Sequence, residues 1–233
     1  MENMFKVAGK IKSIEKSHSY TTRDGETNDF YKAVIEVPRL SDKSDELPMV
    51  IPGKVMAKSM PEKDDLVLME GQVRSRNYTE GESGHLAVFG YVASIAALDG
   101  LSYDDIDNKN IVKLDGYVCK EPTFRKTRTG RTISDLLIAH NRKPYDGVHY
   151  KSDYVPAVAW GALAGKASKM PVGECVEICG RFQSRSYLRK SDSKERTVHE
   201  ISVTSLDIVP GGRLTAGTES HHEELHDENS KVA

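Results

Sequence analysis

An internal repeat is the feature that most constrains the fold of this chain. Residues 71–78, GQVRSRNY, align with residues 180–187, GRFQSRSY, which lie 109 positions later in a sequence of 233 residues. Shorter matches occur at similar offsets: Arg39 with Arg142, Met60-Pro61 with Met170-Pro171, and Arg23-Asp24-Gly25 with Arg128-Thr129-Gly130. Because changes in loop length produce small drifts in the offset, the chain is best explained as two copies of one unit of about 100 residues.

The second copy has the element order of an OB fold. Alternating apolar positions and turn residues predict five strands, with one short helix after the third. The expected strands are 112–118, 132–140, 153–160, 174–188 and 196–209, and the expected helix is 162–170. Three strands, a helix and two strands is the order of a five-stranded OB barrel. The first copy gives the same order, with its helix near 54–60 and its long strand near 66–78.

The pattern predicts an all-β protein with short helices, built from tandem five-stranded OB-fold barrels. It divides the chain into a divergent, acidic OB domain at 1–98, a linker at 99–108, a basic OB domain at 109–209 and a tail at 210–233. The tail is rich in Gly, Ser, His and Glu and lacks periodicity, so we expect it to be disordered.

Charge is distributed unevenly over these segments. Residues 1–108 carry a net charge of −6 and residues 109–209 a net charge of +7, although the whole chain carries only −2. A basic segment within a nearly neutral protein suggests a polyanionic partner. On charge alone, a solvated surface without a partner is an equal alternative. If the partner exists, we expect residues 109–209 to carry most of the affinity.

Strand alternation places cations and tyrosines on one face of each long strand. Side chains alternate between the two faces of a strand. The positions that share a face are Gln72, Arg74, Arg76 and Tyr78 in the first copy, and Arg181, Gln183, Arg185 and Tyr187 in the second. Cations for phosphates and rings for bases are what a sequence-tolerant groove for a single strand of nucleic acid needs.

The strand expected at 153–160 adds two aromatic candidates. Tyr154 and Trp160 share the outward parity, because the small aliphatic residues that alternate with them suit the barrel interior. Trp160 could instead pack beneath the adjacent helix, and the tyrosines could form ordinary cross-strand pairs.

Five short motifs of the second copy occur together in a fixed order. They are NIVKLDG at 110–116, EPTFR at 121–125, AHNR at 139–142, YVPAVAW at 154–160 followed by Leu163-Ala164, and GRFQSRSY at 180–187. In their order and spacing they resemble the bacterial and phage single-stranded DNA-binding protein family. The resemblance implies that Tyr154, Trp160 and Tyr187 stack on bases and that neighbouring basic residues hold phosphates. The candidate binding residues are therefore Tyr154, Trp160, Tyr187, Arg181, Arg185, Arg142, Arg128, Arg74, Arg76 and Tyr78.

The resemblance also bears on assembly. Typical members of that family have one OB domain per chain and form tetramers, so two domains here imply a homodimer with four OB folds. Members usually end in an acidic tip closed by proline and an aromatic residue, which recruits replication and repair enzymes. Residues 229–233, NSKVA, lack this tip. Replication or repair proteins are therefore candidate partners, although recruitment through the tail is not expected.

The sequence offers little for catalysis or cofactors. Cys119, Cys175 and Cys179 are an odd set without a Cys-x-x-Cys pair, and we expect buried structural thiols. Nucleotide-binding glycine loops are absent, and no spacing suggests a nucleophile with its base. We therefore expect no cofactor, no metal and no enzyme activity.

Single-stranded DNA binding during replication, recombination or repair is the leading hypothesis. The alternative is an OB-fold protein-interaction accessory of a primosome or recombination complex, with the acidic first copy docking the partner. An enzyme such as a nuclease, with an unrecognised active site, is a third reading, and RNA binding is a variant of the first. No run of about 18 apolar residues or secretory signal is present, so we expect a cytoplasmic protein without a membrane segment.

Overall fold

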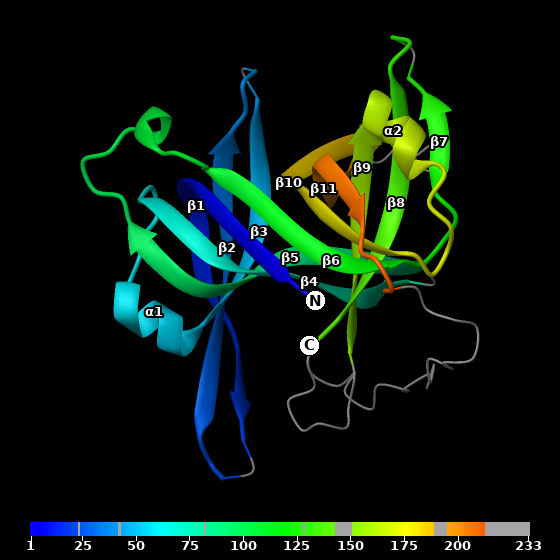
Figure 1. Cartoon of the computed structure of the whole chain (residues 1–233). Helices are drawn as coiled ribbons and strands as arrows, with labels where there is room; N and C mark the ends of the chain where they lie inside the picture. Colours follow the sequence, from blue (N-terminus) through cyan, green and yellow to red (C-terminus); the bar gives the residue numbers. More distant parts are fainter. Residues whose placement is uncertain are drawn as a thin grey trace.

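The strands of this computed structural model form one continuous sheet of 11 strands, curled into two barrels (Figure 1). The structure describes residues 1–22, 24–41, 43–81, 83–127, 129–142, 151–188 and 195–212. The elements of the first half are β1 (Asn3–Thr21), β2 (Thr27–Pro38), β3 (Ser44–Pro52), α1 (Gly53–Ser59), β4 (Leu66–Glu80) and β5 (Ser83–Ala97). A 3₁₀ turn, η1 (Tyr103–Asp105), leads to β6 (Asn110–Val118), β7 (Thr123–Lys126), β8 (Thr132–Asn141), β9 (Ser152–Trp160), α2 (Ala162–Ala167), β10 (Cys175–Leu188) and β11 (Glu195–Ile208).

Each half closes a five-stranded barrel. In the first half β1 pairs with β2 and β4, β2 with β3, β3 with β5, and β5 with β4. In the second half β6 pairs with β8 and β10, β8 with β9, β9 with β11, and β11 with β10. The β3–β5 and β9–β11 pairs are parallel and the others are antiparallel. The expected all-β fold of OB barrels is confirmed.

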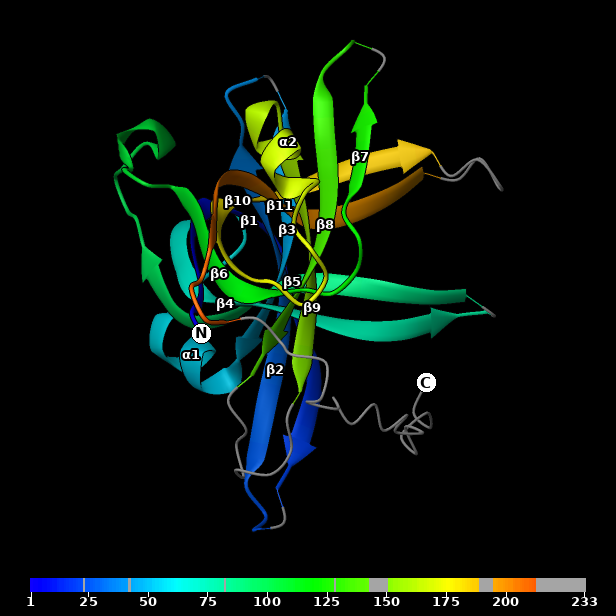
Figure 2. The same cartoon turned by 45° about the vertical axis from the view of Figure 1, so that its right-hand side comes forward.

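The first strands of the two halves join the barrels. β1 and β6 pair antiparallel, with Phe5 opposite Val112. Two-stranded ribbons extend beyond the barrels, among them β1–β2, β4–β5, β7–β8 and β10–β11 (Figure 2). The β4–β5 and β10–β11 ribbons leave on the same side of the molecule, one from each half (Figure 2).

A glycine begins both repeated segments because the neighbouring strand passes too close for a side chain. A Cβ atom on Gly71 would lie 2.0 Å from the carbonyl oxygen of Tyr91, and one on Gly180 would lie 2.3 Å from that of Ser202. The register shifts at both glycines, which marks a β-bulge. Below the bulges, Val73 and Phe182 are completely buried in the core.

The expected elements of the second half are present, with two differences. The short strand β7 pairs with the start of β8 and was not expected. The helix α2 ends at Ala167, because the backbone continues to Met170 with i→i+3 hydrogen bonds. The expected polar loop and charged hairpin loop fall largely on residues 143–150 and 189–194, and the expected tail mostly on residues 213–233, all outside the described residues. Among the residues that are described, no helix has the length and apolar character needed to cross a bilayer.

Candidate nucleic-acid interface

A groove of about 1060 Å³ runs between the two halves of the chain. Its walls come from β1, β2 and β3 on the outer side of the first barrel, from the β4–β5 ribbon, and from the β10–β11 ribbon of the second half. The groove is therefore a composite of segments that are far apart in sequence.

The floor of the groove is apolar. Val34 lies opposite Pro48 in the β2–β3 register, and Val50 lies opposite Lys32. The side chains of Val34, Pro48 and Val50 are only half-buried, so they offer an apolar surface to a ligand in the groove. Aromatic side chains surround this floor: Phe30, Tyr31, Tyr78, Phe89, Tyr91 and Tyr187.

Two of these rings are already stacked on histidines. His18 and Phe30 lie with ring centroids 4.9 Å apart and planes at 12°, and Tyr78 and His85 lie 5.3 Å apart at 28°. Tyr78 and Tyr187 are each 42% exposed. Exposed, partly immobilised rings are suited to stacking on bases at small entropic cost.

Arg74 is a cation without a carboxylate partner in the described part of the chain. Its guanidinium carbon lies 3.7 Å from the centroid of the Tyr91 ring, and its Nη2 donates to Gln72 Oε1 at 3.0 Å. Its buried Nε has no hydrogen-bond partner among the described residues. Burial lowers the pKa of Arg74, and the charge of Arg142 acts in the same direction. An anion in the groove would act in the opposite direction, because a nearby negative charge favours the charged guanidinium.

Arg142 also lines the groove, but its guanidinium is bound within the protein. Its Nε donates to Asp153 Oδ2 at 2.6 Å, and its Nη2 contacts Asp153 Oδ1 and the carbonyl oxygen of Ser75. Asp153 Oδ1 also accepts from the Ser75 amide at 2.6 Å, and the Tyr154 amide donates to Ser75 Oγ at 2.7 Å. Asp153, whose side chain is 1% exposed, therefore holds β9 of the second half against β4 of the first. This pairing raises the pKa of Arg142.

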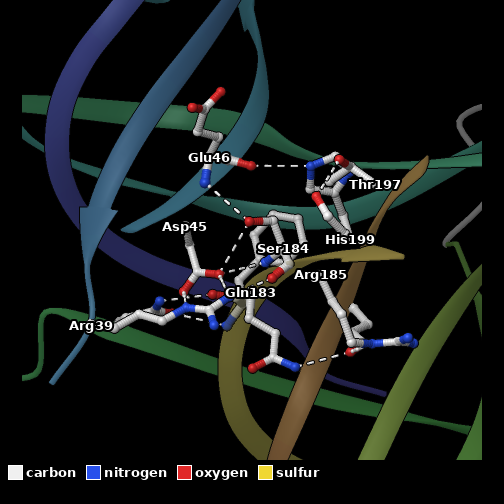
Figure 3. A network of polar contacts seen from close by, with 12 residues as sticks. Arg39, Asp45, Glu46, Gln183, Ser184, Arg185, Thr197 and His199 are labelled. Carbon is white, nitrogen blue, oxygen red and sulfur yellow. Dashed lines mark hydrogen bonds and ion pairs between the residues drawn. The ribbon is translucent and has the colours of Figure 1, made fainter. Parts of the chain in front are cut away.

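The equivalent residues of the two copies form a second network, in which a carboxylate of the first half binds the second half (Figure 3). Asp45, which is 1% exposed, binds Arg39 and accepts from the Ser184 amide at 2.7 Å. Arg39 Nη2 reaches the carbonyl oxygen of Ser184, and the Glu46 amide donates to Ser184 Oγ at 3.2 Å. The halves are therefore locked by two equivalent networks, which fix the relative position of the two walls of the groove.

The groove brings together five of the ten residues predicted from the sequence. Arg74, Arg76, Tyr78, Arg142 and Tyr187 line it. Arg76 is exposed, and the structure gives it no ion pair with any described residue.

Four predicted residues lie away from the groove. Trp160 is 39% exposed at the end of β9, opposite Ile133, so it does not pack in the core. Tyr154 is half-buried next to the interface network. Arg181 is half-buried. Burial raises the pKa of Tyr103, and the positive charge of Arg181 acts in the opposite direction.

Arg185 is the fourth predicted residue outside the groove, and it is held by a buried carboxylate. Its Nε and Nη2 bind Glu200 at 3.0 and 2.9 Å, and Gln183 binds the same carboxylate at 3.0 Å. This pairing raises the pKa of Arg185. Arg128 lies outside the described residues.

Comparison with known proteins establishes the family. The sequence model of the single-strand binding protein family matches residues 109–209. A single-stranded DNA-binding protein of Clostridium tetani is 30% identical over 113 residues, which are 47% of this chain and 77% of that protein. Single-stranded DNA-binding protein 2 of Chlorobaculum tepidum is 33% identical over 105 residues, 43% of this chain and 70% of that protein. The chain belongs to the single-strand binding protein family.

Within the single-strand binding protein family, the structural likeness extends over both halves. The wild-type single-stranded DNA binding protein from Thermus aquaticus superposes with a TM-score of 0.68 at 19% identity, covering 93% of this chain and 97% of that chain. A deletion mutant of that protein gives a TM-score of 0.63 and covers 89% of this chain. At this level of identity the likeness shows the fold.

Sequence reasoning missed the part of the interface that lies on the first barrel. Phe30, Lys32 and Val34 alternate along β2, as Arg74 and Arg76 do along β4, so the parity argument could have found them. Tyr91 becomes recognisable only from the β4–β5 register, where it lies opposite Gln72.

The described residues offer no alternative metal chemistry. Among them, no three His, Cys, Asp or Glu side chains are grouped to hold a metal ion. The three thiols are free. Cys175 is buried, whereas Cys119 and Cys179 are only half-buried, so the expectation of three buried thiols was wrong for two of them. Burial raises the pKa of Cys119 and of Cys175, which keeps them protonated and unreactive.

Proposed function

We propose that this chain binds single-stranded DNA with little sequence preference and protects it during replication, recombination or repair. The observation that carries the proposal is the groove, which combines an apolar floor, exposed tyrosine rings and cations. A duplex buries its base faces, whereas a single strand offers both base faces and phosphates, so these features together favour the single strand. Binding involves no covalent step.

The proposed binding residues fall into two groups. Tyr78 and Tyr187 in the groove and Trp160 on the second barrel offer exposed rings for stacking. Arg74 and Arg76 are available for phosphates. Tyr154 extends the stacking surface, and Arg128 and Arg181 are further candidates for phosphates. We assign Arg142 and Arg185 positioning roles, because their guanidinium groups are bound to Asp153 and Glu200.

We propose two OB domains, 1–98 and 109–209, joined by a linker at 99–108 and followed by a tail at 210–233. Their shared topology and reciprocal contacts support this division. We further propose that two chains form a cytoplasmic homodimer with four OB folds, with replication or repair proteins as further partners.

Titration of the full chain with labelled oligo-dT, oligo-rU and duplex DNA at two salt concentrations tests the function. We expect tight binding to oligo-dT, much weaker binding to duplex, and a log–log salt slope of about −0.7 for each phosphate contacted. Equal affinity for duplex and single strand would refute the proposal. Tighter binding of oligo-rU would instead assign the groove to RNA.

A further inference from the structure

The first half has a negative net charge, but the charged side chains that line the groove beside it are mainly cations. The first half is acidic overall, yet the groove against its outer face is lined by Lys32, Arg74 and Arg76 of that half and by Arg142 and Arg196 of the second, with a single carboxylate, Glu15, among the described residues. We propose that the first, acidic half provides the principal contact surface for the single strand, completed by the β10–β11 ribbon of the second half. This inference rests on the proposed function.

Several acidic residues of the first half form ion pairs, and the paired carboxylates do not line the groove. Lys6 pairs with Glu70, Lys12 with Glu46, and Lys16 with Asp29. The buried carboxylate of Asp45 is paired with Arg39 at the junction with the second half. Because Glu15 is the one carboxylate among the described residues that line the groove, the net charge of −6 does not describe the field inside it.

A comparison of equivalent positions gives the first reason for the assignment. Lys32 lies opposite Val50 in the β2–β3 pair, and Asp135 lies opposite Val158 in the matching β8–β9 pair. The first barrel therefore presents a cation where the second presents a carboxylate. Asp135 in turn binds Arg125 at 2.9 Å, which reduces the attraction of that arginine for a phosphate.

A second pair of equivalent positions also has a carboxylate in the second barrel and none in the first. Phe89 lies opposite Arg74 in the β4–β5 pair, and Glu200 lies opposite Gln183 in the β10–β11 pair. Glu200 holds Arg185, whereas the first copy has a ring at that place, and Arg76 is left without a carboxylate among the described residues. A ring can stack on a base, and an arginine without an ion pair can contact a phosphate. An arginine bound to a carboxylate attracts a phosphate less strongly.

The second half completes the site rather than duplicating it. Tyr187 is 42% exposed and lines the groove together with Thr197 and Val198 from β11. The β10–β11 ribbon thus forms the far wall, held in place by the Asp45–Ser184 contact, while the Asp153–Ser75 contact holds β9 against β4. Of the second-half arginines in the lining, Arg142 is bound to Asp153 and Arg196 to Glu80 at 3.2 Å. A strand in this groove therefore touches both copies, but its phosphates meet mainly the cations of the first.

Three double variants of the full chain test this assignment. Lys32→Gln/Arg76→Gln removes two groove cations. Arg185→Gln/Glu200→Gln removes the second-barrel ion pair as a unit, so that no buried charge is left unpaired. Lys113→Gln/Lys169→Gln removes two exposed lysines outside the groove and matches the first variant in charge. Each is titrated with oligo-dT over a range of salt concentrations, and its melting temperature is recorded.

We expect the Lys32→Gln/Arg76→Gln variant to bind oligo-dT about tenfold more weakly, which corresponds to about 1.4 kcal/mol. Its log–log salt slope should become shallower by about 1.4, for two lost phosphate contacts. The other two variants should stay within about twofold of the wild type. Lys32→Asp, which installs the carboxylate of the second copy, should weaken binding further and provides a second test should the double variant fail to fold.

The outcomes separate the two proposals. An equal or larger loss in Arg185→Gln/Glu200→Gln would overturn the assignment to the first half, as would a Lys32→Gln/Arg76→Gln variant that behaves like the lysine control. In both cases the wild type would still bind oligo-dT, and the proposed function would stand. Wild-type protein that does not prefer oligo-dT to duplex would refute the function itself.

Discussion

Removal of the Asp153 carboxylate tests how the two halves are held together. Asp153 is 1% exposed and accepts hydrogen bonds from the Ser75 amide and from two nitrogens of Arg142. In Asp153→Ala the Ser75 amide is left buried without an acceptor, which costs about 1–3 kcal/mol. The guanidinium of Arg142, 29% exposed, loses its counter-ion as well. Together these losses should lower the free energy of unfolding by about 3–5 kcal/mol, the usual result of breaking a buried pair.

Asp135→Ala is the matched control for this prediction. Asp135 also pairs with an arginine, Arg125, but the two side chains are 33% and 46% exposed. Such a pair contributes about 0–1 kcal/mol, so the control should remain close to the wild type. Urea denaturation followed by circular dichroism measures both variants, and Asp153→Ala should also melt about 6–20 °C lower. If Asp153→Ala loses no more stability than Asp135→Ala, the account of the interface is wrong.

Three further predictions follow from individual residues. Trp160→Ala should leave the melting temperature nearly unchanged, because Trp160 is 39% exposed, and should weaken binding of long oligo-dT about 5- to 150-fold if the ring stacks on a base; unchanged affinity in fluorescence anisotropy would remove Trp160 from the binding surface. Burial lowers the pKa of His199 from its usual 6.5, so the unfolded chain takes up the proton first as the pH falls. Stability should therefore decrease below about pH 6.5, and His199→Gln should flatten this part of the stability–pH curve; an unaltered curve contradicts the assignment. Gly71→Ala should destabilise the fold by at least about 1–3 kcal/mol, because its Cβ would lie 2.0 Å from the carbonyl oxygen of Tyr91, and a variant that melts like the wild type would show that the bulge can relax.

Local patterns in the sequence determined the architecture. The repeat of residues 71–78 at 180–187 required two copies of one unit, and strand alternation gave the order of strands in each barrel. Alternation also placed Arg74, Arg76 and Tyr78 on one face, because the direction of a side chain in a strand depends only on its position along that strand. The family likewise followed from short motifs within residues 109–209.

Only the tertiary structure decided which of these side chains have partners. Arg142 and Arg185 have the same chemistry as Arg76 in the sequence, yet the first two bind Asp153 and Glu200. These partners are set by register between strands and by packing between barrels. The groove itself arises where ribbons from both halves project to the same side, so neither copy contains it alone. Net charge could not reveal this, because a sum over residues does not record which charges neutralise each other in space.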